Sequence, residues 1–251
     1  MNKTSIFFGR LPVLLVLICL VLLVGIRGWS QPQIENQPIP AGKDDSQVSQ
    51  VKEKITKDWH IEFSEDFSDV EIGQEPESLF ILDGDYTVQK GEKDRKSLKL
   101  PGTPMGDFGL LFGPREKEKN LELNFSFFAS NKGRRMPSIA ASIGGIRGYC
   151  LRLSPAAKKI VLSMDETILQ ESMFSWKGDQ WWKIRFQALT GSLIQSTRLQ
   201  FKLWPEKEKE PADWYLSEVY DVEYIGGKCA LWGFPYSSMP ILFDDLEIRS
   251  N

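Results

Sequence analysis

The 251-residue sequence contains a single histidine, His60, and only three cysteines. One histidine excludes catalytic triads and multi-histidine metal sites that do not include His60 itself. Excess charge of one sign is also missing, since 31 Lys and Arg stand against 34 Asp and Glu. This balance offers no general attraction to a phosphate backbone, so we expect no nucleic-acid partner. The hydrophobic content of 41% nevertheless suffices for one sizeable folded core.

Only one long hydrophobic run is present, at residues 11–26 (LPVLLVLICLVLLVGI), with Lys3 and Arg10 before it and Arg27 after it. As a helix these 16 residues would span about 24 Å, less than the roughly 30 Å of a bilayer core but more than most signal-peptide segments. The run predicts a membrane helix. Positive charge at the amino end predicts that this end stays inside the cell.

Residues 1–30 can be either an uncleaved signal-anchor or a cleaved signal peptide. Gly28 and Ser30 form a small-x-small cleavage pattern, but Trp29 lies between them. An anchor predicts a single-pass protein of the cell membrane with its C-terminal domain outside the cytoplasm. Cleavage predicts a secreted or periplasmic protein instead. Both alternatives make the rest of the chain extracytoplasmic.

The exported part divides into a flexible linker and one all-β domain. Residues 31–57 are rich in Gln, Pro, Ser and charge, which is typical of a tether. Residues 58–251 consist of short apolar or alternating runs separated by turn residues, which predicts an antiparallel two-sheet jelly-roll sandwich. The clearest strand signals lie at residues 121–128, 138–143, 148–153, 159–164, 181–189, 198–204, 229–233 and 241–249.

Cys19 lies within the apolar run, which leaves Cys150 and Cys229 in the exported domain. In an oxidising compartment these two residues could form a disulfide, or they could be two separately buried thiols. The sequence leaves both alternatives open. Neither alternative gives them a catalytic role.

Several stretches together carry a resemblance to a known superfamily: FSEDFSD, GYCLRL, WKGDQWWKIRFQ, CALWG and FDDLEIR. They resemble the concanavalin A-like lectin/glucanase jelly rolls, particularly the laminin-G-like, sugar-associated modules of exported proteins. The resemblance covers residues 59–249 and implies a β-sandwich with carbohydrate binding or hydrolysis as its activity. The glucanases of this group carry alternating carboxylates on one strand, whereas Asn124 and Ser126 follow Glu122 here. This departure implies a non-catalytic module.

A candidate glycan-binding face follows from strand alternation. In residues 181–188, Trp182, Ile184 and Phe186 fall on one face, which we expect to be the core. The opposite face and the matching face of residues 199–204 carry cations, amides and indoles, which can hydrogen-bond hydroxyls and stack on pyranose rings. The predicted glycan-binding residues are Trp181, Lys183, Arg185, Gln187, Lys202 and Trp204. The alternative is that loops cover the tryptophans and the cations form a solvated surface.

A structural calcium is the one cofactor that the sequence suggests. The resemblance implies that the first and last strands lie side by side near such an ion, whose ligands are carboxylates and carbonyls. The candidate ligands are Glu65, Asp66, Asp244 and Asp245. Alternatively, these are turn carboxylates that accept hydrogen bonds from backbone N–H groups.

These observations predict a membrane-anchored extracytoplasmic module that binds a polysaccharide or an exported protein partner without catalysis. A carbohydrate-active hydrolase with loop-borne carboxylates is the second hypothesis. A structural scaffold domain of the cell envelope is the third.

Overall fold

A computed structural model describes residues 58–251 apart from 92–93, 131–135, 192–194 and 237. The predicted membrane helix, the linker and Cys19 lie outside the described residues. Within the described part of the chain, no helix is both long and apolar enough to cross a bilayer.

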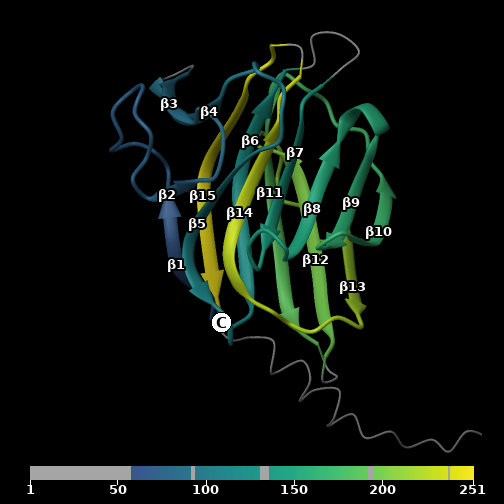
Figure 1. Cartoon of the computed structure of the whole chain (residues 1–251). Coiled ribbons are helices and arrows are strands. Elements are labelled where there is room, and N and C mark those ends of the chain that lie inside the picture. Colours follow the sequence, from purple (N-terminus) through teal and green to yellow (C-terminus); the bar gives the residue numbers. More distant parts are fainter. Residues whose placement is uncertain (1–57, 92–93, 131–135, 192–194, 237) are drawn as a thin grey trace, which may run out of the picture. The chain divides into compact units, whose positions relative to one another are not determined.

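The described residues form an all-β sandwich of two antiparallel sheets, which confirms the predicted fold class (Figure 1). The first sheet has eight strands, in the order β13 (Leu216–Tyr220), β12 (Thr197–Pro205), β11 (Gln180–Thr190), β6 (Leu121–Ala129), β15 (Ile241–Ser250), β4 (Lys96–Leu100) and β3 (Thr87–Lys90). Its eighth strand, β1 (His60–Glu65), pairs with the C-terminal half of β15, whereas β4 pairs with the N-terminal end of β15.

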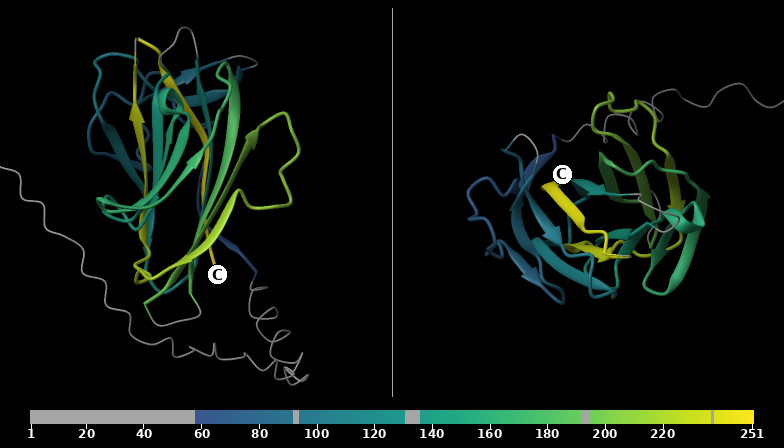
Figure 2. Two further views of the ribbon diagram at one scale, coloured as in Figure 1. Left: turned by 90° about the vertical axis from the view of Figure 1, so that its right-hand side faces the viewer. Right: turned by 90° about the horizontal axis from the view of Figure 1, so that it is seen from above.

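The second sheet has seven strands and packs against the first (Figure 2). Its order is β10 (Thr167–Met173), β9 (Lys159–Met164), β8 (Tyr149–Ser154), β7 (Ser138–Ile143), β14 (Gly227–Phe234), β5 (Phe108–Glu116) and β2 (Leu79–Ile81). A short 3₁₀ turn, Pro155–Ala157, joins β8 to β9. Gly144 and Gly145 join β7 to β8 with φ values of +96° and +80°, which glycine adopts without strain.

The core lies between the sheets and is built by the predicted alternation. Trp182, Ile184 and Phe186 of β11 are buried in it, as are Phe125 and Phe127 of the neighbouring β6. Alternate residues on the same strands therefore reach the outer face of the eight-stranded sheet. That face carries the site described below.

Cys150 and Cys229 are free thiols. Strand β7 lies between them, with Ser142 beside Cys150 and Ile143 beside Cys229. Because successive residues of β7 point to opposite sides, the two cysteines lie on opposite faces of the sheet and cannot be bridged in this register. Burial raises the pKa of the Cys150 thiol to about 11, which keeps it protonated at neutral pH.

Candidate functional site

The outer face of the eight-stranded sheet carries polar side chains in rows that run across the strands. Cross-strand pairing fixes these rows, because directly paired residues share a face. Across β15, β6, β11 and β12 the rows are Asp244–Ser126–Lys183–Trp204, Glu247–Asn124–Arg185–Lys202 and Arg249–Glu122–Gln187–Gln200. The alternation predicted for β11 and β12 therefore produces a continuous polar surface.

A cleft of about 570 Å³ opens on this face. Side chains of the central strands form its floor, and two segments form its walls. One wall is the end of β1, and the other is the connection of residues 206–215 that follows β12. The polar and aromatic residues that line it are Ser64, Asp66, Asn124, Ser126, Lys183, Arg185, Trp204, Glu206, Glu208, Glu210, Asp245 and Glu247.

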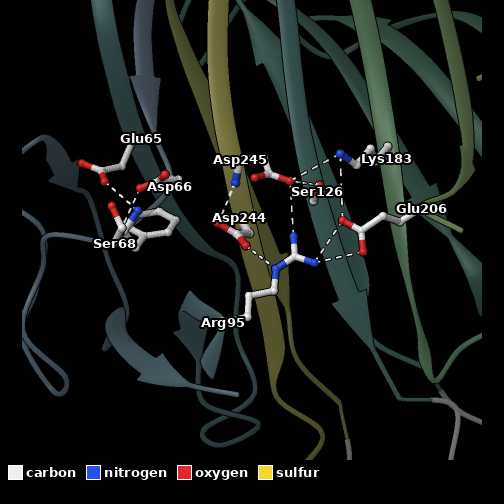
Figure 3. A network of polar contacts seen from close by, with 10 residues as sticks. Glu65, Asp66, Ser68, Arg95, Ser126, Lys183, Glu206, Asp244 and Asp245 are labelled. Carbon is white, nitrogen blue, oxygen red and sulfur yellow. Dashed lines mark hydrogen bonds and ion pairs between the residues drawn. The ribbon is translucent and has the colours of Figure 1, made fainter. Parts of the chain in front are cut away.

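Arg95, which lies just before β4, links three acids from two segments, β15 and the 206–215 connection, at one end of the cleft (Figure 3). Its guanidinium donates to Asp244, to both carboxylate oxygens of Glu206 at 3.0 and 2.9 Å, and to Asp245 at 3.3 Å. It also lies over the Trp181 ring, 3.8 Å from the centroid. One cation thus forms ion pairs with three carboxylates and covers an indole.

Asp244 and Asp245 lie side by side because β15 contains a bulge. The register against β6 shifts between Asp244 and Glu247, and Asp245 has a positive φ of 50°. Both acids therefore lie opposite Ser126, whose hydroxyl donates to Asp245 at 2.8 Å. Asp244 is only 3% exposed. Burial raises its pKa to about 6, although Arg95 acts in the opposite direction.

At the other end of the cleft, the 206–215 connection is held to the sheet by Glu210. The same oxygen, Oε1, lies 2.9 Å from Arg185 and 2.6 Å from Lys202. The Lys202 ammonium also donates to the Pro211 carbonyl at 3.0 Å and lies 4.8 Å from the centroid of the Trp214 ring. Figure 2 shows this connection in its left view as a yellow-green loop that projects from the sheet.

The structure brings three of the six predicted glycan-binding residues to the cleft, namely Lys183, Arg185 and Trp204, although Trp204 is only 9% exposed. The others lie on the predicted face but are covered. Arg95 occupies one side of the Trp181 ring, and Glu210 contacts the buried Lys202. Gln187 is buried in a hydrogen-bonded row, where it donates to Glu122 and accepts from Gln200 at 2.5 Å.

The four predicted calcium ligands do not come together. Glu65 pairs with Leu246, a core residue, so its side chain leaves the sheet on the face opposite to Asp244. It accepts instead from the Phe67 N–H at 2.8 Å and from the Ser78 hydroxyl at 2.6 Å. Asp66 accepts from the Ser68 N–H at 2.9 Å, and hydrogen bonds from Ser68 lower the pKa of Asp66. These contacts match the alternative of turn carboxylates.

The Arg95 guanidinium donates hydrogen bonds to Asp244 and Asp245, the other two predicted ligands (Figure 3). The four residues therefore do not fit a calcium ion in this arrangement. Among the residues that the structure describes, no three His, Cys, Asp or Glu side chains are grouped to hold a metal.

Sequence reasoning missed Arg95 and the 206–215 connection. Glu206, Glu208 and Glu210 alternate with Lys207 and Lys209 in the sequence PEKEKEP. This period of two could have shown that the glutamates share one side. Arg95 carries no such signal, because it is 149 residues from Asp244 in the chain.

Comparisons with known proteins give a likeness in fold. No protein-family model and no curated protein matches the chain. Among solved structures, lectin I-B4 from Griffonia simplicifolia in its metal-free form has 10% identity and a TM-score of 0.49, with 78% of this chain and 100% of that chain covered. A GH131 β-glucanase catalytic domain from Podospora anserina has 10% identity and a TM-score of 0.47, covering 76% and 96%.

The exoplasmic/lumenal domain of VIP36, in a form bound to Ca²⁺ and mannose, has 10% identity and a TM-score of 0.44, covering 68% and 81%. Neither a ligand nor an activity follows for this chain from so distant a likeness.

Proposed function

We propose that the all-β domain is a carbohydrate-binding module of an exported, membrane-held protein, and that the cleft on the eight-stranded sheet is its binding site. The observation that carries the proposal is the composition of the cleft. Amide, hydroxyl, carboxylate, ammonium and guanidinium groups surround the indole of Trp204 in a space of about 570 Å³. That volume lies in the usual range for small-ligand sites, roughly 300–1,000 Å³.

The chemistry of a sugar matches this composition. Its hydroxyls need donors and acceptors at several positions, which Asn124, Lys183 and Arg185 supply. Its C–H groups need an apolar contact, and Trp204, which is 9% exposed, offers the edge of its indole at the cleft. The sheet holds these groups through backbone pairing, so little conformational entropy is lost when a ligand binds.

Polysaccharide retention by the detergent-solubilised full chain tests the proposal. Wild type should be retained on at least one neutral polysaccharide, and Trp204→Leu should lower that retention about tenfold. Trp232→Leu is the matched control, because Trp232 lies on β14 in the other sheet and outside the cleft. If no polysaccharide retains the wild type, or if both variants lose retention equally, the proposal fails and a protein partner or scaffold role takes its place.

A hydrolase is the second candidate, and one observation favours it. Glu206, Glu208 and Glu210 line one wall of the cleft, and Asp245 and Glu247 of β15 lie on its floor, so carboxylates do come from outside β6. Ion pairs engage Glu206, Glu210 and Asp245, which favours binding over catalysis. New reducing ends from a soluble polysaccharide, abolished by Glu208→Gln, would establish the hydrolase instead.

A further inference from the structure

Two cations face each other on paired strands at one end of the cleft. Arg185 of β11 and Lys202 of β12 are directly opposite in the register, so their side chains share the outer face. Like charges in this position destabilise a sheet unless an anion lies between them. Lys202 is 7% exposed, so water does not provide the screening.

The anion is the Glu210 carboxylate, which belongs to the connection and not to the sheet. Its Oε1 atom contacts both cations, at 2.9 and 2.6 Å. The sheet offers Arg185 a weaker pairing, since Glu122 Oε1 lies 3.6 Å away. An oxyanion between Arg185 and Lys202 is thus a requirement of the sheet, and Glu210 is the group that meets it.

Glu210 can be displaced. Its side chain is 34% exposed, and the connection that carries it lies on the surface between β12 and β13. Arg185 has a second anchor, because its Nε donates to Asn124 at 3.0 Å, and the Lys202 ammonium has the Pro211 carbonyl. Arg185 would therefore keep its position if another oxyanion replaced the Glu210 side chain, and Lys202 would keep its own while the backbone at Pro211 stays in place.

We infer that the space between Arg185 and Lys202 is an anion subsite of the cleft, which Glu210 fills in this structure and which a carboxylate or sulfate group of an acidic glycan occupies on binding. This inference rests on the proposed function and names its ligand class. Glu210 then acts as an internal competitor that weakens binding of acidic chains. Neutral glycans do not compete with it.

Glu210→Gln tests the inference, because it removes the charge and keeps the side-chain shape. Binding of oligogalacturonate, dextran sulfate and neutral dextran to the full chain is measured at low and high salt. We expect Glu210→Gln to bind at least one of the two acidic probes about tenfold more tightly than wild type, a larger gain than for neutral dextran. The two acidic probes distinguish carboxylate from sulfate recognition. The gain should shrink at high salt.

Asp213→Asn is the matched control. Asp213 lies in the same connection, is exposed, and does not line the cleft, so its substitution changes the net charge equally. Equal gains in both variants, or no gain with Glu210→Gln, would overturn the subsite. Lys202→Met supplies a second measurement and should bind the acidic probes more weakly than wild type. Unchanged binding there would also overturn it.

The outcomes separate this inference from the proposed function. If neutral polysaccharide is retained through Trp204 and Glu210→Gln brings no gain, the cleft binds glycans but the anion subsite is wrong. If Glu210→Gln binds the acidic probes more tightly than wild type, but the wild type is not retained on neutral polysaccharides, the anion subsite is supported. The proposal of general glycan binding then fails.

Discussion

Trp181 and Trp182 are adjacent in β11 but lie on opposite faces of the sheet. Trp182 packs in the core with ring centroids 5.7 Å from Phe174 and 6.4 Å from Trp176, and its indole N–H donates to Lys177. Trp181 lies beneath Arg95 on the outer face. We expect Trp182→Ala to lower the free energy of unfolding by about 3–5 kcal/mol. Trp181→Ala should lower it by about 1 kcal/mol, the loss of one cation–π contact. Equal losses in denaturant titrations would place both rings in the core.

Arg95 is the shared partner of Asp244, Asp245 and Glu206, so its removal leaves several carboxylates facing one another. We expect Arg95→Met to destabilise the domain by about 3 kcal/mol, since Asp244 would be a buried and unpaired charge. Asp244→Asn in the same chain should restore part of the loss, and a double-mutant cycle measures this coupling. Simple additivity of the two substitutions would contradict the network.

Asp244 also makes stability depend on pH. Its pKa rises from 3.8 to about 6 on folding, mainly through burial. The folded state therefore binds more protons than the unfolded state between these values, and this group stabilises the domain less as pH rises through 6. We expect Asp244→Asn to reduce the fall in unfolding free energy between pH 4 and pH 7. An identical pH profile in wild type and variant would show that Arg95 keeps the carboxylate ionised throughout.

At the scale of elements, the first and last strands, β1 and β15, pair as expected. Their acidic residues, however, do not face a common point where a calcium ion could bind. Glu65 and Asp66 accept hydrogen bonds from backbone N–H groups two residues further along the chain, and Arg95 donates to Asp244 and Asp245. We expect a chelator and excess calcium to leave the melting temperature unchanged. A calcium ion bound at a hundredfold excess over its Kd would stabilise the fold by about 2.7 kcal/mol, so calorimetry can detect the opposite result.

Most of the long strands could be predicted from the sequence, although β5 was missed, and the connections could not be predicted. Strands β7 and β9 have the expected bounds, and β11 and β12 each extend one residue further at both ends. Their alternation placed Lys183, Arg185 and Trp204 correctly, because side-chain direction in a strand is a local property. The bulge in β15 and the position of Arg95 depend on pairing between distant segments. No local pattern carries that information.

At the scale of the whole domain, the two outer faces differ in chemistry. The eight-stranded sheet presents ion pairs and amides around a cleft, as the rows through Arg185 and Glu122 show. In the seven-stranded sheet the small side chains of Ala140 and Ser142 are buried, with Trp232 paired to Ala140, and Arg152 lies over the Phe234 ring. A polar ligand with many hydroxyls therefore finds its partners on the first face.

The proposed extracytoplasmic location follows from Lys3 and Arg10 before the apolar run, and it makes a prediction about the whole protein. In intact cells with a sealed outer barrier, added protease should leave the domain whole, whereas opening that barrier should expose the 31–57 linker to cleavage and release the sandwich. The sandwich itself should resist, because its backbone is paired in two sheets.

A cytoplasmic protein of known location serves as the control for membrane integrity. Cleavage only after the inner membrane is opened would reverse the orientation, since the positive-inside rule would then have failed for this chain. A cytoplasmic domain would also have no access to exported polysaccharide, which would contradict the carbohydrate-binding proposal.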